Sequence, residues 1–593
     1  MTIETRAPAR AWTRFLHAGV HTVAVAILLL AAPPARAVPL DEDGTINVNL
    51  RAYVNARFST MATQSTRPSN PDSFGGTYPF VGAGNVIQNR YFLELKWQHD
   101  LLPLVEDYVP DGISALSYLL SYRGEYEGIY DFGAKSFSQN LESLQEIQEV
   151  LRDDGTSQDV AQQILSQQRH RLRQVASYRN RLFQVYGDVE WGPIFLRVGR
   201  QNLVWGETDV FRLLDNINPV DDSFGGFFID LDERRVPLNM VRGSAYLGTF
   251  GPLDQTFIEG YVAVDNTVAF IPGAPIGSPW SAPLGPPGGR TAGTLIGPCG
   301  FCDENVRGGG RVVTNVGDFT FTLASYFTFL DVQGVRFVQP LEGQTPHYIP
   351  GVTAIEAQSS APRVWINGAS MTTAVPDLKS VLRSEIAWFR DEPFFRGPTP
   401  DAFPGTASTT DPQYLTQFLL PVLNMNRNGG VNDPNAPSFD TLYRTDTLNF
   451  SVGWDMNQYI RFLNPTQTFF FSAQVFYRHI FGFDPWTAYP VPVPNNPTRV
   501  VERVQDEILQ TLLVNTTYNT IVPGTSFNIQ TTPGLALYYD WQGMLLFQPS
   551  LRFGRDPWRL VIDYSTINSG VFRGLIGFVR DRSNVRVQVE FVI

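Results

Sequence analysis

The chain has 593 residues, a formal net charge of −12, 17% charged residues and 13% aromatic residues. The acidic balance argues against nucleic acid as a partner, and the charged fraction is below the roughly 25% usual for soluble domains. Beyond the extreme N-terminus no apolar run reaches the ~18 residues of a membrane helix, so any membrane crossing requires strands.

The N-terminal segment has the pattern of an export signal. Arg6, Arg10 and Arg14 precede an apolar run at 23–32, and Ala35, Arg36 and Ala37 form a small-x-small cleavage site. We therefore expect residues 1–37 to be a cleaved signal peptide and residues 38–593 to form an exported domain in the outer membrane of a Gram-negative cell.

Alternating apolar and polar residues recur along the mature chain. The pattern runs for thirteen residues at 46–58, longer than the usual five or six of a soluble sandwich strand, and returns at 448–457, 558–565 and 585–593. The last stretch resembles the C-terminal signal that the barrel-assembly machinery recognises. It ends in Ile593 where an aromatic residue is usual, so recognition is expected to depend partly on Phe591.

Connections between these stretches alternate between short and long, as in outer-membrane barrels. Short turns are expected at Gly192-Pro193, Gly251 to Asp254, Gly317-Asp318, Pro376-Asp377, Pro523-Gly524 and Arg555 to Pro557, and a short link on the opposite side at Gln542-Gly543. The sequence predicts an all-β fold, a transmembrane antiparallel β-barrel of 16–18 strands. The count is eighteen, or sixteen if Pro533-Gly534 interrupts a strand.

Residues 138–178 depart from this pattern and predict a helical hairpin insertion. Its first helix carries Glu142, Glu146 and Glu149, and its second carries Arg169, Arg171, Arg173 and Arg179. Pairing of the two helices explains these charges; a docking surface or a lid over the pore is the alternative.

A family resemblance begins where Leu196-Arg197-Val198-Gly199-Arg200-Gln201 leads to Trp205-Gly206-Glu207 and then to Asn216-Ile217-Asn218-Pro219-Val220-Asp221. These motifs, with 382–390 and the tail from Pro557, resemble the outer-membrane barrel family catalogued as domain of unknown function 1302 (DUF1302). The resemblance implies an outer-membrane barrel associated with an inner-membrane efflux pump and a periplasmic partner, and transport of lipid-like compounds.

The segment 204–239 is the leading site candidate, as a loop folded inward to narrow the lumen. Opposed charges there would create a transverse field that selects solutes; a salt-bridge network that only fastens the loop is the alternative. Strand parity puts Arg197 and Arg200 on opposite faces unless a bulge near Gly199 intervenes. The pore-constriction candidates are Arg197, Arg200, Glu207, Arg212, Asp215, Arg234, Arg235 and Arg242.

Elsewhere, Glu259, Arg383, Glu385 and Arg478 are candidates for lumen-facing groups. Cys299 and Cys302 lie in a Pro/Gly-rich loop, where a small disulfide is expected, with no further ligands for a metal.

We expect a channel or transport protein for small hydrophobic or amphipathic molecules, working without a cofactor, because Phe470, Phe476 and Val561 also point to the expected lumen face. The alternative is a structural or partner-docking barrel with a plugged lumen. An outer-membrane hydrolase with a Ser-His pair assembled across strands is the third hypothesis.

Overall fold

The computed structural model describes residues 38–60, 83–132, 178–267, 291–295, 305–331, 334–338, 348–349, 352–360, 362–396, 442–521, 528–569 and 582–593, apart from positions 42, 209, 210, 226, 227, 486, 494 and 495. The expected signal peptide, the helical hairpin before residue 178, Cys299 and Cys302 lie outside these residues.

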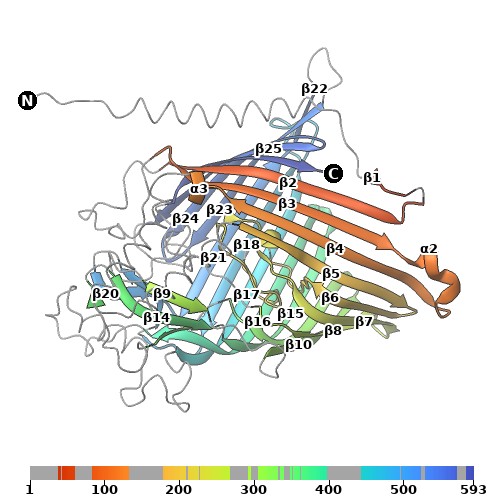
Figure 1. The fold of residues 1–593 in the computed structure, drawn as a ribbon, viewed down its shortest axis with the longest axis horizontal. Coiled ribbons are helices and arrows are strands. Elements are labelled where there is room, and N and C mark those ends of the chain that lie inside the picture. The colour runs from red at the N-terminus through yellow and green to blue at the C-terminus, as the bar shows by residue number, and fades with distance from the viewer. Residues whose placement is uncertain are drawn as a thin grey trace, which may run out of the picture.

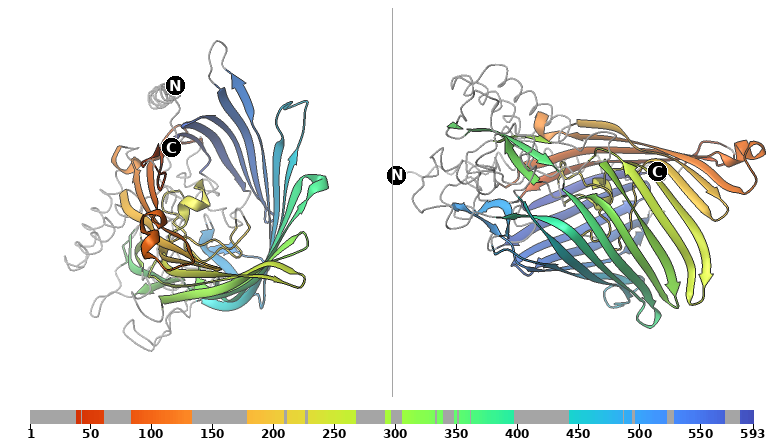
Figure 2. Two further views of the ribbon diagram at one scale, coloured as in Figure 1. Left: turned by 90° about the vertical axis from the view of Figure 1, so that its right-hand side faces the viewer. Right: turned by 90° about the horizontal axis from the view of Figure 1, so that it is seen from below.

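Eighteen of the described strands form one antiparallel ring (Figures 1 and 2). In chain order they are β2 (Ile46–Ser59), β3 (Val86–Asp100), β4 (Ile113–Glu127), β5 (Tyr178–Trp191), β6 (Ile194–Gln201), β7 (Leu238–Phe250), β8 (Leu253–Val264), β10 (Val306–Val316), β11 (Phe319–Phe329), β15 (Arg363–Val375), β16 (Ser380–Arg396), β17 (Leu442–Gln458), β18 (Phe469–Ile480), β21 (Asp506–Thr516), β23 (Asn528–Asp540), β24 (Met544–Arg555), β25 (Trp558–Ser569) and β26 (Asn584–Val592).

The ring closes where the first of these strands meets the last. β2 pairs with β26 from Arg51 opposite Val592 to Ser59 opposite Asn584. Closure leaves no unpaired strand edge, which is the condition for a sheet to lie in lipid. The all-β barrel prediction is confirmed, with eighteen rather than sixteen strands.

The sixteen-strand alternative fails because Pro533 does not break β23. Pairing of β23 with β21 ends at Gly534, and pairing with the short strand β22 (Tyr518–Ile521) begins at Thr531. Pro533 therefore lies in the gap between two partners, where the strand needs no N–H donor on that side.

The short turns join the strands at the predicted positions. They are Gly192-Pro193, Gly251-Pro252, Gly317-Asp318 and Asp556-Pro557. A 3-10 turn at Pro376–Leu378 joins β15 to β16, and Trp541 to Gly543 join β23 to β24 on the opposite side. The turn expected at Pro523-Gly524 lies outside the described residues.

Smaller elements accompany the ring. They are the strands β1 (Val38–Pro39), β9 (Thr291–Leu295), β12 (Gly334–Val338), β13 (Tyr348–Ile349), β14 (Val352–Ser360), β19 (Thr487–Val493) and β20 (Asn496–Glu502), and the short helices α2 (Leu102–Val105), η1 (Glu106–Tyr108), α3 (Ile129–Phe132) and α6 (Leu231–Arg234). Among the described residues no helix is long and apolar enough to cross a bilayer.

The two faces of the wall have opposite chemistry. Outward positions carry exposed apolar side chains, among them Leu196, Val198, Val241, Val262, Leu323, Trp365, Trp388, Phe450 and Trp454. The alternate positions carry buried charged groups, among them Arg57, Arg90, Arg123, Glu125, Glu259, Glu385 and Asp563. An apolar exterior around a charged interior is the pattern of an outer-membrane β-barrel, and this protein is one.

Candidate functional site

The connection from β6 to β7, residues 202–237, lies inside the ring; we call it the lumen segment. Figure 2 shows its short yellow helix α6 within the circle of strands. Its contacts reach the wall on two sides, at β2 to β5 and at β8 to β18. It therefore crosses the barrel interior.

Asn218 ties the two ends of the lumen segment together. Its side-chain oxygen accepts the backbone N–H of Leu203 at 2.8 Å, and its amide donates to the carbonyls of Gln201 (3.3 Å) and Val236 (3.0 Å). The Val236 N–H also donates to the Pro219 carbonyl at 2.8 Å. One buried asparagine thus holds a loop whose ends start and finish at neighbouring strands.

One side of the lumen segment packs through apolar side chains. The buried cluster combines segment residues with wall residues from β7 to β18: Leu203, Trp205, Leu213, Leu214 and Ile217 with Leu238, Met240, Tyr261, Ala263, Ala324, Tyr326, Leu330, Val364, Ile366, Ala387, Phe389 and Phe476. Phe211 packs edge-on against Phe476, with ring centres 5.0 Å apart. This apolar anchor fixes the first half of the segment to the wall.

Trp205 is the centre of the apolar anchor. Its ring meets Tyr261 and Tyr326 edge-on at 5.4 and 5.6 Å, and its indole N–H donates to Glu259 at 2.5 Å. The hydroxyl of Tyr326 donates to the Leu214 carbonyl at 3.0 Å. Because the Trp205 indole N–H and the Tyr326 hydroxyl are hydrogen-bonded, these two rings bury apolar surface and also have a fixed orientation.

The opposite side of the lumen segment is held by charge. Glu233 in α6 forms ion pairs with Arg51 (2.8 Å) and Arg90 (3.1 Å), and accepts the Tyr53 hydroxyl at 2.6 Å. Arg123 donates to the Glu233 carbonyl at 2.8 Å. We call these contacts with β2, β3 and β4 the ionic anchor.

A second carboxylate extends the ionic anchor toward β5. Asp221 pairs with Arg179, whose guanidinium also lies 3.3 Å from Glu125 and 4.3 Å from the ring centre of Phe224. Arg57, fully buried, donates to the Phe228 carbonyl at 3.0 Å. The second half of the segment is therefore bonded to four consecutive strands.

The surroundings of these carboxylates favour their charged forms. Burial raises the pKa of Glu233, but Arg90, Arg51 and the Tyr53 hydroxyl outweigh burial and hold that pKa below its ordinary value. Burial likewise raises the pKa of Asp221, and the Arg179 and Arg181 guanidiniums reverse the shift. Both groups are ionised near neutral pH and stabilise the attached segment.

The predicted constriction residues within the segment bond mainly to the segment itself. Arg234 pairs with Asp222 at 2.5 Å, and Arg235 pairs with Asp215 and Asp232. Burial raises the pKa of Asp215 even beside Arg235. These pairs give the segment its own shape.

Arg212 and Glu207 connect the segment to the wall. Arg212 donates to the carbonyls of Asp215 (3.1 Å) and Asn218 (2.7 Å) and pairs with Asp331, while burial lowers its pKa to about 10. Glu207 takes part through its backbone, since its N–H donates to Glu385 and its carbonyl accepts from Arg383.

The wall arginines of the predicted constriction pair with different carboxylates. Arg197 pairs with Asp188 on β5 at 2.7 Å, and Arg242 pairs with Glu259 on β8 at 2.7 Å. Arg200 corrects the prediction: β6 pairs with both neighbours without a register shift, so alternation places it on the outer face. Its guanidinium lies 3.6 Å from Asp265.

The four other predicted lumen groups occupy the inner wall. Glu259 contacts Trp205 and Arg242, and Glu385 accepts the Leu214 N–H at 3.2 Å. Arg383 pairs with Asp455 at 2.8 Å, and Arg478 pairs with Glu392. Glu259 and Glu385 are contacts of the apolar anchor.

Sequence reasoning missed Glu233, the acidic partner of the ionic anchor. The available signal was the polar face of 46–58, where Arg51 and Arg57 point inward and require acidic or carbonyl partners. No spacing in the sequence links Arg51 to a carboxylate 182 positions away.

Among the described residues no group of three or more His, Cys, Asp and Glu side chains could hold a metal. Within that part of the chain His99 contacts the Tyr118 hydroxyl at 3.3 Å, and His479 contacts Asp506 at 2.7 Å. His170 and His347 lie outside it.

The model of a protein family described as "Protein of unknown function (DUF1302)" matches residues 18–298, just under half of the chain. The predicted family resemblance is confirmed there. No curated protein gives a significant match to the sequence.

Solved structures from Acinetobacter baumannii and Pseudomonas aeruginosa match this chain at low similarity. Acinetobacter baumannii OccAB3 has a TM-score of 0.40 at 9% identity, over 92% of this chain and 98% of that chain. Pseudomonas aeruginosa OccK2 (OpdF) in complex with glucuronate has a TM-score of 0.36 at 8% identity, with the same coverage. P. aeruginosa OpdK with vanillate has a TM-score of 0.36 at 9% identity, also with that coverage. The fold assignment depends on the strand pairing given above.

Proposed function

We propose that this protein is a non-enzymatic outer-membrane channel for small molecules, with the lumen segment as its constriction. The observation that carries the proposal is a closed ring of eighteen strands crossed by the lumen segment, which is attached at both sides. Barrels of sixteen to eighteen strands are wide enough to leave an aqueous passage. A crossing segment narrows such a passage.

Charged groups on the inner wall remain in contact with solvent. The side chain of Arg51 is 31% exposed, that of Arg478 is 23% exposed and that of Arg242 is 21% exposed, although each is in an ion pair. Partial exposure beside the segment supports an incompletely filled lumen. This favours a channel over a plugged, structural barrel, which remains the second candidate.

For the transported molecule we propose a small amphipathic compound. The lumen segment presents paired charges on the ionic side and aromatic rings on the other, where Phe211 packs against Phe476 and Tyr538. A solute with a polar and an apolar side would contact both. A role beside an efflux pump and a periplasmic partner remains a proposal from the family resemblance alone.

The test is conductance of the purified full-length protein in planar bilayers. We expect stepwise currents with a modest ion preference, because the inner-wall charges are largely paired. Silence of the wild type, and equally of a variant lacking residues 138–178 and of a variant with the ionic anchor removed, would instead establish a plugged barrel.

A further inference from the structure

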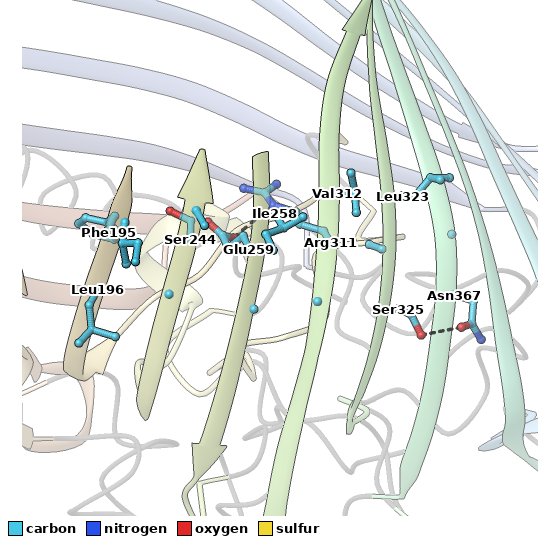
Figure 3. Close-up of a pocket in the computed structure, with 17 residues that line it drawn as sticks. Phe195, Leu196, Ser244, Ile258, Glu259, Arg311, Val312, Leu323, Ser325 and Asn367 are labelled. Atoms are coloured by element: carbon cyan, nitrogen blue, oxygen red, sulfur yellow. Dashed lines mark hydrogen bonds and ion pairs between the residues drawn. The ribbon is translucent and has the colours of Figure 1, made fainter. Parts of the chain in front are cut away.

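The outer face of the wall from β6 to β15 contains an apolar groove of about 760 Å³. Figure 3 shows its lining residues on these adjacent strands, including Ile258, Val312 and Leu323. Each of these three alternates with an inward-facing neighbour, so the groove opens toward the lipid. It lies outside the lumen and takes no part in the proposed channel.

A row of small residues produces the groove. Gly243, Gly260 and Gly310 are successive register partners on β7, β8 and β10, and the row continues through Ser325 and Asn367 on β11 and β15. Short turns of outer-membrane barrels are periplasmic, so the strand ends joined by long connections are extracellular. The row on the extracellular side carries Val241, Val262, Gly308, Phe327 and Trp365, and the row on the other side carries Ala245, Ile258, Val312, Leu323 and Ala369. Missing side chains between two bulky rows leave a trough in the hydrocarbon-facing surface.

Three arginines lie on the same outer face near the extracellular ends of β15, β16 and β17. Arg390 is the register partner of Trp365. Arg444 donates to the backbone carbonyls of Arg363 (3.4 Å) and Asp391 (3.1 Å). The Arg363 guanidinium lies over the ring of Phe327 on β11 at 4.3 Å and donates to the Val306 carbonyl on β10 at 3.4 Å.

Two carboxylates accompany these arginines. Asp446 accepts the Trp388 indole N–H and the Asp391 backbone N–H, both at 3.0 Å. Asp391 lies 3.7 Å from Arg390, and both side chains are about two-thirds exposed (65% and 68%), so this pair is weak. Three guanidiniums against two carboxylates leave a net positive charge at this edge.

Trp365 connects the arginines to the groove. Its indole N–H lies 3.0 Å from both the Ser325 hydroxyl and the Asn367 side-chain oxygen. Asn367, Trp365 and Arg363 follow one another on the outer face of β15, so Arg363 starts about 13 Å along the strand from the groove. Half of the hydrocarbon core is about 15 Å thick. If the arginines lie at the level of the lipid headgroups, the groove therefore lies among the acyl chains.

We propose that this face binds a phosphorylated lipid of the outer leaflet, with its phosphate against Arg363, Arg390 and Arg444 and an acyl chain in the groove. Guanidinium groups match phosphate geometry, the indole of Trp365 suits the interface, and the apolar trough suits a hydrocarbon chain. The site is independent of the proposed transport function.

The experiment is native mass spectrometry of the full-length protein with bisphosphorylated lipid A, and with phosphatidylcholine as a comparison lipid. The test variant combines Arg390→Gln with Arg444→Gln. The matched control combines Lys379→Gln with Arg461→Gln, two exposed cations at the periplasmic ends of the same wall that both lie near the Tyr459 ring. Heat-modified mobility on gels confirms that each variant is folded.

We expect lipid A to bind the wild type and the control equally, and the test variant about thirty-fold more weakly, because each cation near an anionic surface contributes about fivefold. A Cβ at position 243 meets only ordinary contacts, the nearest at 3.7 Å, so Gly243→Leu should place its side chain in the groove and weaken lipid A binding with every arginine in place. The proposal would be overturned if the test and control variants lost lipid A affinity equally, or if the wild type did not prefer lipid A over phosphatidylcholine. A protein dimer that persists in excess lipid A would also overturn it.

Discussion

Glu233→Gln is the sharpest perturbation of the lumen segment, because it removes one charge and keeps the side-chain shape. The side chain is 7% exposed and contacts two arginines and the Tyr53 hydroxyl. Removing one partner from a buried ion pair costs about 3 to 5 kcal/mol. Here Arg51 keeps Glu590 at 2.6 Å and Arg90 keeps Glu125 at 2.6 Å, so we expect the lower end, about 3 kcal/mol.

A loss of about 3 kcal/mol shifts the equilibrium between attached and detached α6 roughly a hundredfold toward detachment. The apolar anchor keeps the first half of the segment in place. Planar-bilayer recordings should therefore show larger and more frequently fluctuating conductance, and limited trypsin digestion should cleave near Arg234 and Arg235.

The matched control is Asp222→Asn. Asp222 is a carboxylate of the same segment, but its recorded ion-pair partner is Arg234, also in the segment. It should leave conductance and digestion close to wild type. Equal behaviour of Glu233→Gln and wild type in both assays would show that the ionic anchor does not hold the segment and would refute the constriction proposed here.

Three further predictions concern the barrel wall, the apolar anchor and the ionic anchor. Gly309→Ala should lower stability by about 1 to 3 kcal/mol, because its Cβ would overlap the backbone of β11, whereas Gly260→Ala meets only a backbone oxygen at 3.4 Å; unfolding midpoints on heat-modified gels compare the two. Trp205→Phe keeps an aromatic side chain but replaces the indole by a smaller phenyl ring and loses the N–H that bonds Glu259, so denaturant titration should show a loss of at least about 1 to 3 kcal/mol. Acid should release the ionic anchor, because folding lowers the pKa values of Glu233 and Asp221. The stabilisation that these two carboxylates contribute is therefore complete above the ordinary carboxyl pKa of about 4. It declines as the pH falls through the lowered values. Protection of the segment's backbone amides from hydrogen–deuterium exchange, corrected for the intrinsic pH dependence of exchange, measures that release at each pH.

The barrel was predictable because lipid outside and water inside impose a period of two on each spanning strand. Residues 46–58 show that period, and β2 is indeed a strand at Ile46–Ser59. The short turns follow from Gly, Pro and Asp at strand ends. The local sequence could not decide whether Pro533 interrupts a strand. A strand accepts proline there only because its two neighbours on one side, β21 and β22, stop pairing at that position.

The lumen segment was predictable as a charged loop, but its partners were not. Arg234 and Arg235 bond within the segment, whereas their neighbour Glu233 reaches the wall. Three adjacent charged residues therefore have different roles, set by the backbone of a single helical turn. Arg200 shows the same limit on a strand: only the absence of a bulge decides its face.

The two anchors differ in chemistry, and this difference determines which one detaches first as the pH falls. The apolar anchor is made mainly by packing of apolar side chains, with the carboxylates of Glu259 and Glu385 as additional contacts, whereas the ionic anchor depends on Glu233 and Asp221 remaining charged. In acid the second half of the segment should therefore detach while the first half stays attached. Since glutamine cannot titrate, Glu233→Gln should show a smaller further loss of protection between pH 7 and pH 3 than wild type. An acid-induced loss of unchanged size in that variant would assign the titration to other carboxylates and leave Glu233 with a role in shape alone.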